Sequence, residues 1–201
     1  MKTQSVPQPR HCGFEAVAAN SVRPSPLRVG KVSDPPRLRT LLPVRLRPQE
    51  TEGWCWAASV EMILNYFGAA FSQCDIANKQ FSTERCCPDP PGEYRGGAWP
   101  EFEKFGFTCK TTQTALSWGV VSGEIRAGRP FVFCRRWDGG QYHLMVVSGC
   151  YLTATGRRYI QIHNPSPPGV GGIHKVPYRQ YVHGNGFAHE RTYYEIRRVQ
   201  P

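Results

Sequence analysis

A cysteine that could act as a nucleophile lies in the stretch from Gln49 to Gly68, QETEGWCWAASVEMILNYFG. The apolar residues that follow it recur with helical period: Trp56, Val60, Ile63, Leu64 and Phe67. Gly68 is a typical helix stop, so the pattern predicts a helix from about Cys55 to Phe67. Cys55 would then occupy the first turn, where free backbone N–H groups and the helix dipole favour a thiolate and lower the thiol pKa. The alternative is a buried cysteine that serves as a small apolar side chain.

A thiolate nucleophile needs a base, and the base needs a group that fixes its tautomer. His143 lies in the strand-like segment Tyr-His-Leu-Met-Val-Val, and Asn164 ends the next such segment, where its amide oxygen could accept the ring N–H. Gln49, six residues before the cysteine, could form an oxyanion hole with the Cys55 backbone N–H. The structural alternatives are a core histidine bonded to a carbonyl, a turn asparagine before proline and a polar loop glutamine. His163 alternates to the opposite strand face and is a weaker candidate.

The elements that would position these residues change from helices to strands along the chain. Further helices are predicted at 73–80, at 99–105 with Gly106 closing it, and at 121–127. Strands are predicted at 43–46, 131–137, 142–151, 157–163 and 192–199, and Asp-Gly-Gly at 138–140 predicts a hairpin between two of them. Helices first and strands second indicate an α+β fold with an antiparallel sheet.

The first 42 residues are rich in proline and show no sustained period, so we expect a basic, disordered leader before a domain spanning 43–201. Residues 1–48 hold nine Lys and Arg against two acidic residues, which accounts for most of the net charge of +10. Charge concentrated in a tail does not support nucleic-acid binding by the fold. No apolar run is long enough for a membrane span, and the N-terminus has no apolar core of an ordinary secretion signal.

The eight cysteines are more than a reduced cytosolic protein usually carries, and they favour an oxidising destination. With Cys55 and Cys12 set aside, six remain, which allow three bridges in fifteen connectivities between which the sequence does not choose. Zinc binding by some of these cysteines is disfavoured because the adjacent Cys86 and Cys87 lack the usual ligand spacing. We therefore expect neither a metal nor another cofactor.

The order Gln49, Cys55-Trp56, His143, Asn164 resembles that of the papain-like cysteine peptidases. The resemblance covers residues 43–201 and implies a helical lobe packed against an antiparallel sheet lobe, with Cys55, His143 and Asn164 as the catalytic residues and Gln49 in the oxyanion hole. A Gly-Gly pair at this point of the family binds the substrate backbone, which implies substrate binding at Gly96, Gly97 and the nearby Trp99.

Within that superfamily, the short chain and the Cys-Trp-Ala-Ala and Asn-Pro sequences look most like the short bacterial peptidases, which include staphopain-like enzymes and exported effectors. Trp54 before the nucleophile and Pro165 after Asn164 depart from the plant and lysosomal enzymes. The resemblance implies a monomeric, exported effector or toxin that acts on a protein or peptide substrate, with a target-cell or inhibitor protein as a further partner.

Two other functions fit the same residues. Transglutaminases and glutamine deamidases use a similar Cys–His–Asp/Asn site for acyl transfer, because fold and site do not fix the reaction. A disulfide-braced interaction module that uses exposed aromatic residues such as Trp99 would explain the cysteines, but it would leave the order of Gln49, Cys55, His143 and Asn164 unexplained.

Overall fold

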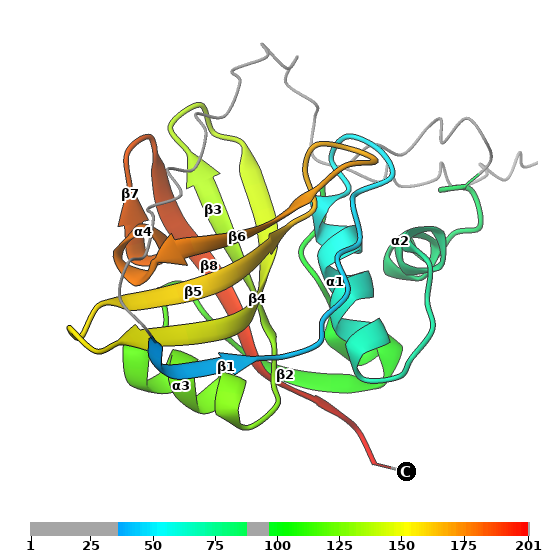
Figure 1. The fold of residues 1–201 in the computed structure, drawn as a ribbon. Helices are drawn as coiled ribbons and strands as arrows, with labels where there is room; N and C mark the ends of the chain where they lie inside the picture. The colour runs from blue at the N-terminus through cyan, green and yellow to red at the C-terminus, as the bar shows by residue number, and fades with distance from the viewer. Residues whose placement is uncertain (1–35, 88–96, 201) are drawn as a thin grey trace, which may run out of the picture.

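The computed structural model describes residues 36–87 and 97–200, in which a helical region precedes an antiparallel sheet, as the α+β prediction required (Figure 1). The helices of this part are α1 (Cys55–Tyr66), α2 (Gln73–Phe81), the 3-10 helix η1 (Phe102–Phe105), α3 (Trp118–Arg126) and α4 (Tyr178–Val182). The strands are β1 (Pro36–Leu41), β2 (Phe107–Thr112), β3 (Phe131–Trp137), β4 (Tyr142–Thr153), β5 (Arg158–Asn164), β6 (Gly172–Pro177), β7 (His183–Gly184) and β8 (Phe187–Arg198).

The helix that carries the cysteine runs as predicted, with Gly68 just past its end at φ 80°. In α2, Ser72 and Asp75 form a capping box, in which each side chain accepts a bond from the other residue's backbone N–H. The helix predicted at 99–105 is shorter, because only Phe102–Phe105 form a 3-10 turn that Gly106 closes. The helix predicted at 121–127 begins earlier, because the side chain of Ser117 caps its N-terminus.

The sheet has the order β2-β8-β3-β4-β5-β6, with β1 paired to β4 and β7 to β8. The hairpin predicted around Asp-Gly-Gly joins β3 to β4, and the β3 bounds match the prediction. Strands β4, β5 and β8 are each shifted or longer than predicted, and β2, β6 and β7 were not predicted. The sequences of β2, β6 and β7 lack a regular apolar–polar alternation, so pairing with neighbouring strands, rather than local pattern, makes these segments strands.

Strand β1 corrects two predictions made for the N-terminal region. Residues 43–46 are not a strand, whereas Pro36–Leu41 pair with the end of β4. The folded part therefore includes residues that were assigned to the leader of 1–42, and four of the nine cations of residues 1–48 lie in the described part. The rest of that leader lies outside the described residues.

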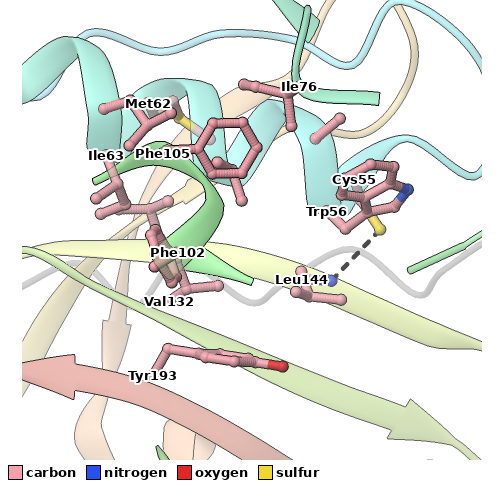
Figure 2. Packing of buried hydrophobic residues seen from close by; sticks show 14 of the residues in the cluster. Cys55, Trp56, Met62, Ile63, Ile76, Phe102, Phe105, Val132, Leu144 and Tyr193 are labelled. Atoms are coloured by element: carbon pink, nitrogen blue, oxygen red, sulfur yellow. Dashed lines mark hydrogen bonds between the residues drawn. The ribbon is translucent and has the colours of Figure 1, made fainter. Parts of the chain in front are cut away.

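The sheet buries apolar side chains on both faces. One cluster packs α1, α2 and η1 against β3, β4 and β8, and Figure 2 shows its centre around Trp56, Ile63 and Phe102. The second cluster fills the other face beneath α3 and α4, with Phe131, Ile162 and other aliphatic and aromatic residues. Because both clusters meet at β4, that strand is fixed from two sides, and so are the residues at its start.

A disulfide joins Cys74 of α2 to Cys87, while Cys109, Cys134 and Cys150 are free thiols. This settles one bridge of the connectivities that the sequence left open. None of the helices in the described ranges is long and apolar enough to cross a bilayer.

Candidate active site

The first turn of α1 places Cys55 against the start of β4. The backbone N–H of Leu144 donates to Cys55 Sγ at 3.5 Å, and Figure 2 shows this contact between the helix and the strand. Since Leu144 follows His143 directly, the sulfur lies beside the backbone that carries the predicted base. In the described part of the chain the thiol bonds to backbone N–H groups and makes no direct hydrogen bond to the imidazole.

The thiol is only 7% exposed, and this burial has a larger effect on its pKa than the helix terminus has. Burial raises the pKa of Cys55 because it disfavours the thiolate, while the backbone N–H groups of Leu144, Trp56 and Cys55 lower it. The sequence-based expectation of a lowered pKa is therefore wrong for the free protein. Ionisation of this thiol depends on transfer of its proton to a nearby base.

The imidazole of His143 has a fixed tautomer. Its Nε2 lies 2.7 Å from Asn164 Oδ1, and the same oxygen accepts the backbone N–H of Ser166 at 3.0 Å. A backbone N–H can only donate, so the bonded atom of Asn164 must be the amide oxygen rather than the nitrogen. His143 Nε2 therefore carries a hydrogen, and in the neutral ring Nδ1 keeps its lone pair. A histidine in this state can accept a proton at Nδ1.

A buried cation lies across the strand pair from His143. Arg135 is the β3 residue opposite it, is 1% exposed, and donates to the Gln180 carbonyl at 3.0 Å. The guanidinium lies 4.1 Å from the Phe187 ring centroid and has no carboxylate partner in the described ranges. Burial lowers the pKa of Arg135 to about 10. Burial also lowers the pKa of His143, the bond to Asn164 raises it, and the charge of Arg135 lowers it further.

Replacing Arg135 by methionine should raise the pKa of His143, because one of the two causes that disfavour the imidazolium is removed. The shift can be followed by NMR of the ring proton in protein that also carries Cys55→Ala, so that the thiol does not titrate with it. The fold should survive, since methionine keeps a side chain of similar length in the buried site and removes a charge whose burial is costly. The matched control is Arg136→Met, because Arg136 is half exposed and pairs with Glu190 at 3.2 Å. An unchanged or lowered pKa in Arg135→Met would contradict this account.

Gln49 is buried and tied to the loop that follows Asn164. Its backbone N–H donates to the Pro165 carbonyl, and its carbonyl accepts from Gly169 N–H, both at 2.9 Å. Its side-chain Nε2 donates to the Thr51 carbonyl at 3.0 Å, which uses one of the two amide hydrogens. The second hydrogen remains for another acceptor, while its role in an oxyanion hole stays a prediction.

The predicted substrate-binding residues are only partly described, because Gly96 lies outside the described residues. Gly97 is exposed, and a Cβ built there would meet nothing within 4 Å, so open space borders it. The Trp99 ring packs edge-on against Tyr142, with centroids 5.4 Å apart, and beneath the Arg191 guanidinium at 4.3 Å. Since Tyr142 precedes His143, Trp99 borders the start of β4 from the helical side.

His163 takes no part in this arrangement. It lies on β5 opposite Val146, is 1% exposed, and neither ring nitrogen has a hydrogen-bond partner in the described part. Burial lowers its pKa to about 4, so the ring is neutral near pH 7. Two participants were missed in the sequence. The Leu144 N–H is not revealed by any side-chain pattern, whereas Arg135 could have been found as a charge that directly follows the apolar run Phe131–Cys134 within one strand.

The leading cysteine of the helical region touches β4, whose histidine bonds to an asparagine on the neighbouring strand β5, and this arrangement on an α+β fold is consistent with a papain-like peptidase fold. The sequence profile of the Peptidase_C39 like family matches residues 41–198, and the chain belongs to this family. None of the curated proteins compared with the chain matches it. Membership supports a cysteine peptidase, which is a hydrolase that acts on protein or peptide substrates.

Proposed function

We propose that the protein is a cysteine endopeptidase in which Cys55, His143 and Asn164 form the catalytic set and Gln49 contributes to the oxyanion hole. The observation that carries the proposal is the bond from His143 Nε2 to Asn164 Oδ1, next to the strand residue that bonds the Cys55 sulfur. This combination leaves Nδ1 of His143 able to accept a proton and places its backbone next to the residue that contacts the buried thiol. The family match over residues 41–198 supports the same reaction class.

In the proposed mechanism, His143 Nδ1 takes the proton of the Cys55 thiol, and the thiolate attacks the carbonyl carbon of a peptide bond. The free hydrogen of the Gln49 amide and a backbone N–H stabilise the oxyanion that forms. His143 returns its proton to the leaving amine as the C–N bond breaks. It then takes a proton from water, whose oxygen attacks the thioester and releases the carboxylic acid and the thiol. Asn164 keeps the ring oriented through both steps.

The test is analysis of the products that the wild-type protein makes from an unfolded protein substrate. Mass spectrometry should find new peptide termini, and an irreversible thiol-directed peptide inhibitor should block cleavage and label Cys55. Release of ammonia or formation of isopeptide bonds without new termini would replace the proposal by glutamine deamidation or transglutamination. If neither kind of product forms and every thiol is alkylated slowly, the result would favour a non-enzymatic interaction module.

Trp99 is the substrate-binding residue of the proposal for which the structure offers the clearest test. Trp99→Ala should lower kcat/KM roughly tenfold, mainly through a higher KM, because the ring that borders the start of β4 is lost while the thiol and imidazole stay in place. Steady-state kinetics on a peptide found in the product analysis would measure this. Phe71→Ala is the matched control, because the Phe71 ring is also half-buried and packs edge-on against Phe105 rather than against β4. Equal losses in the two variants would contradict the proposal.

We further propose that the enzyme is exported and acts outside the cell that makes it, as an effector or toxin. The disulfide between Cys74 and Cys87 supports an oxidising destination. Fractionation of cells and culture medium, with the protein detected by antibody, tests this proposal. Protein confined to the cells with Cys74 and Cys87 reduced would exclude it.

A further inference from the structure

A group of cations gathers at the end of β5 that lies away from the catalytic residues. A hollow of about 660 Å³ opens there between the β4–β5 turn and the start of α4. Its lining contains three arginines together with Gly156, Tyr159, Pro177 and Tyr178, and no acidic residue. The basic face is defined here as those three arginines with their two neighbours on β1 and β6: Arg39, Arg157, Arg158, Lys175 and Arg179.

Aromatic rings hold several of these cations in place. Lys175 Nζ lies 4.1 Å from the Tyr151 ring centroid and 5.1 Å from that of Tyr159. Arg39 lies over the same Tyr151 ring at 5.9 Å, and Arg158 lies over Trp118 at 5.6 Å. A cation stacked on a ring keeps its N–H donors free at its edge. Apart from a bond between Arg39 and the Tyr151 hydroxyl, the stacked cations thus keep their N–H donors available.

The backbone beneath the basic face is also well ordered. The Thr153 side chain accepts the Arg157 N–H at 2.9 Å and fixes the turn that presents two of the arginines. Arg39, Tyr151, Tyr159 and Pro177 are successive partners across β1, β4, β5 and β6, so one row of the sheet supports Arg39 and Lys175.

The cations of the basic face have no carboxylate partner within residues 36–87 and 97–200. The ion pairs found within those two ranges involve cations that lie elsewhere in the fold: Arg47, Lys104, Lys110, Arg129, Arg136 and Arg197. Charge repulsion between Arg39 and Lys175 contributes to lowering the pKa of Lys175, after burial. A cluster of like charges that repel one another attracts a multiply charged anion.

The position of the basic face indicates which anion it meets. Strand β5 begins with Arg158 in the hollow and ends with Asn164 in the catalytic set, and Figure 1 shows it running from the β4–β5 turn toward the start of α1. Six residue steps at about 3.3 Å each separate the two ends by about 20 Å. An extended polypeptide held at the thiol therefore needs at least about six residues between the scissile bond and the segment that meets the basic face.

We propose that the basic face is a second substrate-binding site, which takes an acidic segment of the protein being cleaved. The inference rests on the proposed peptidase function and names its substrate class: proteins with several Asp or Glu residues at a distance from the cleaved bond. Carboxylates bind the guanidinium edges in the bidentate manner that favours arginine at such sites.

Binding can be tested without catalysis. Protein carrying Cys55→Ala is titrated into a fluorescein-labelled poly-glutamate peptide, and anisotropy is followed at low ionic strength. The triple variant R157Q/R158Q/R179Q should bind roughly tenfold more weakly, and high salt should abolish the difference. The matched control R85Q/R197Q/R198Q loses the same charge at exposed positions elsewhere and should bind like the parent. Equal weakening by both triple variants would overturn the proposal, because net charge alone would then explain binding.

Catalysis provides the second arm. A cleavable peptide that carries an acidic extension beyond a flexible linker should have a roughly tenfold higher kcat/KM than the same peptide with a glutamine extension. The advantage should vanish in R157Q/R158Q/R179Q, while cleavage of the glutamine form stays unchanged. No cleavage of either peptide by the wild-type protein would count against the peptidase function, whereas equal cleavage of both would count against the acidic-segment site. Binding of single-stranded DNA, with no binding of the acidic peptide, would assign the face to a nucleic acid instead.

Discussion

Cys55→Ala should abolish cleavage, with kcat/KM reduced on the order of 10⁴-fold or more, because no other group in the site can form the thioester. The fold should persist. The lost contacts are weak bonds from backbone N–H groups to sulfur, among them that of Leu144, so the free energy of unfolding should fall by only about 1 kcal/mol. Kinetics on an unfolded protein substrate, together with a thermal melt of the same preparation, measures both quantities.

Cys134→Ala is the matched control for that result. Cys134 is fully buried in the same apolar cluster as Cys55 and is also a free thiol. Its replacement should lower stability to a similar extent and leave cleavage within a few-fold of wild type. Cleavage that persists in Cys55→Ala, or that disappears equally in Cys134→Ala, would refute the assignment of the nucleophile.

His143→Gln should lower kcat/KM by about 10³- to 10⁴-fold, because a glutamine amide can donate to Asn164 Oδ1 but cannot accept the thiol proton. Alkylation of Cys55 near neutral pH should slow in parallel. In the proposed mechanism the imidazole offsets the raised pKa of the buried thiol by taking its proton, and the variant lacks that partner. The rate of iodoacetamide modification at Cys55, read by mass spectrometry, reports this step separately from turnover.

His183→Gln provides the comparison, since His183 is exposed in β7 and lies outside the catalytic set. In this variant Cys55 should be alkylated, and the substrate cleaved, at the wild-type rates. If His143→Gln loses turnover while Cys55 alkylates at the wild-type rate, His143 is not the base that activates the thiol.

The predictable part of the fold is the part that local sequence pattern determines. The helix at Cys55 was found because its apolar spacing and Gly68 agree, and β3 and the hairpin after it because Asp-Gly-Gly demands a tight turn. Strand β1 was missed because its proline and arginines resemble a leader, and only pairing with β4 makes it a strand. Strand β6 likewise depends on its register with β5.

The proximity of two site residues could be predicted from the sequence, but their electrostatic environment could not. That Asn164 would meet His143 followed from their places on neighbouring strands, and the 2.7 Å contact confirms their proximity. Their catalytic roles, and that of Gln49, remain predictions. The thiol pKa could not be obtained from helix position, because burial depends on residues such as Leu144 that only the tertiary fold brings to the thiol. The position of the Arg135 charge opposite His143 depends on strand register in the same way.

The side chain of Gln73 in α2 makes three hydrogen bonds to residues outside its own helix, so its loss would affect the segment around Gln49. Its buried amide donates to the Pro48 carbonyl at 2.8 Å and to Glu61 at 3.0 Å, and it accepts the Glu50 N–H at 2.9 Å. The residues on either side of Gln49 are thereby anchored to a helix that begins over twenty positions later. A minimised enzyme trimmed to the nucleophile helix and the sheet would lack this anchor, so α2 belongs in any working fragment.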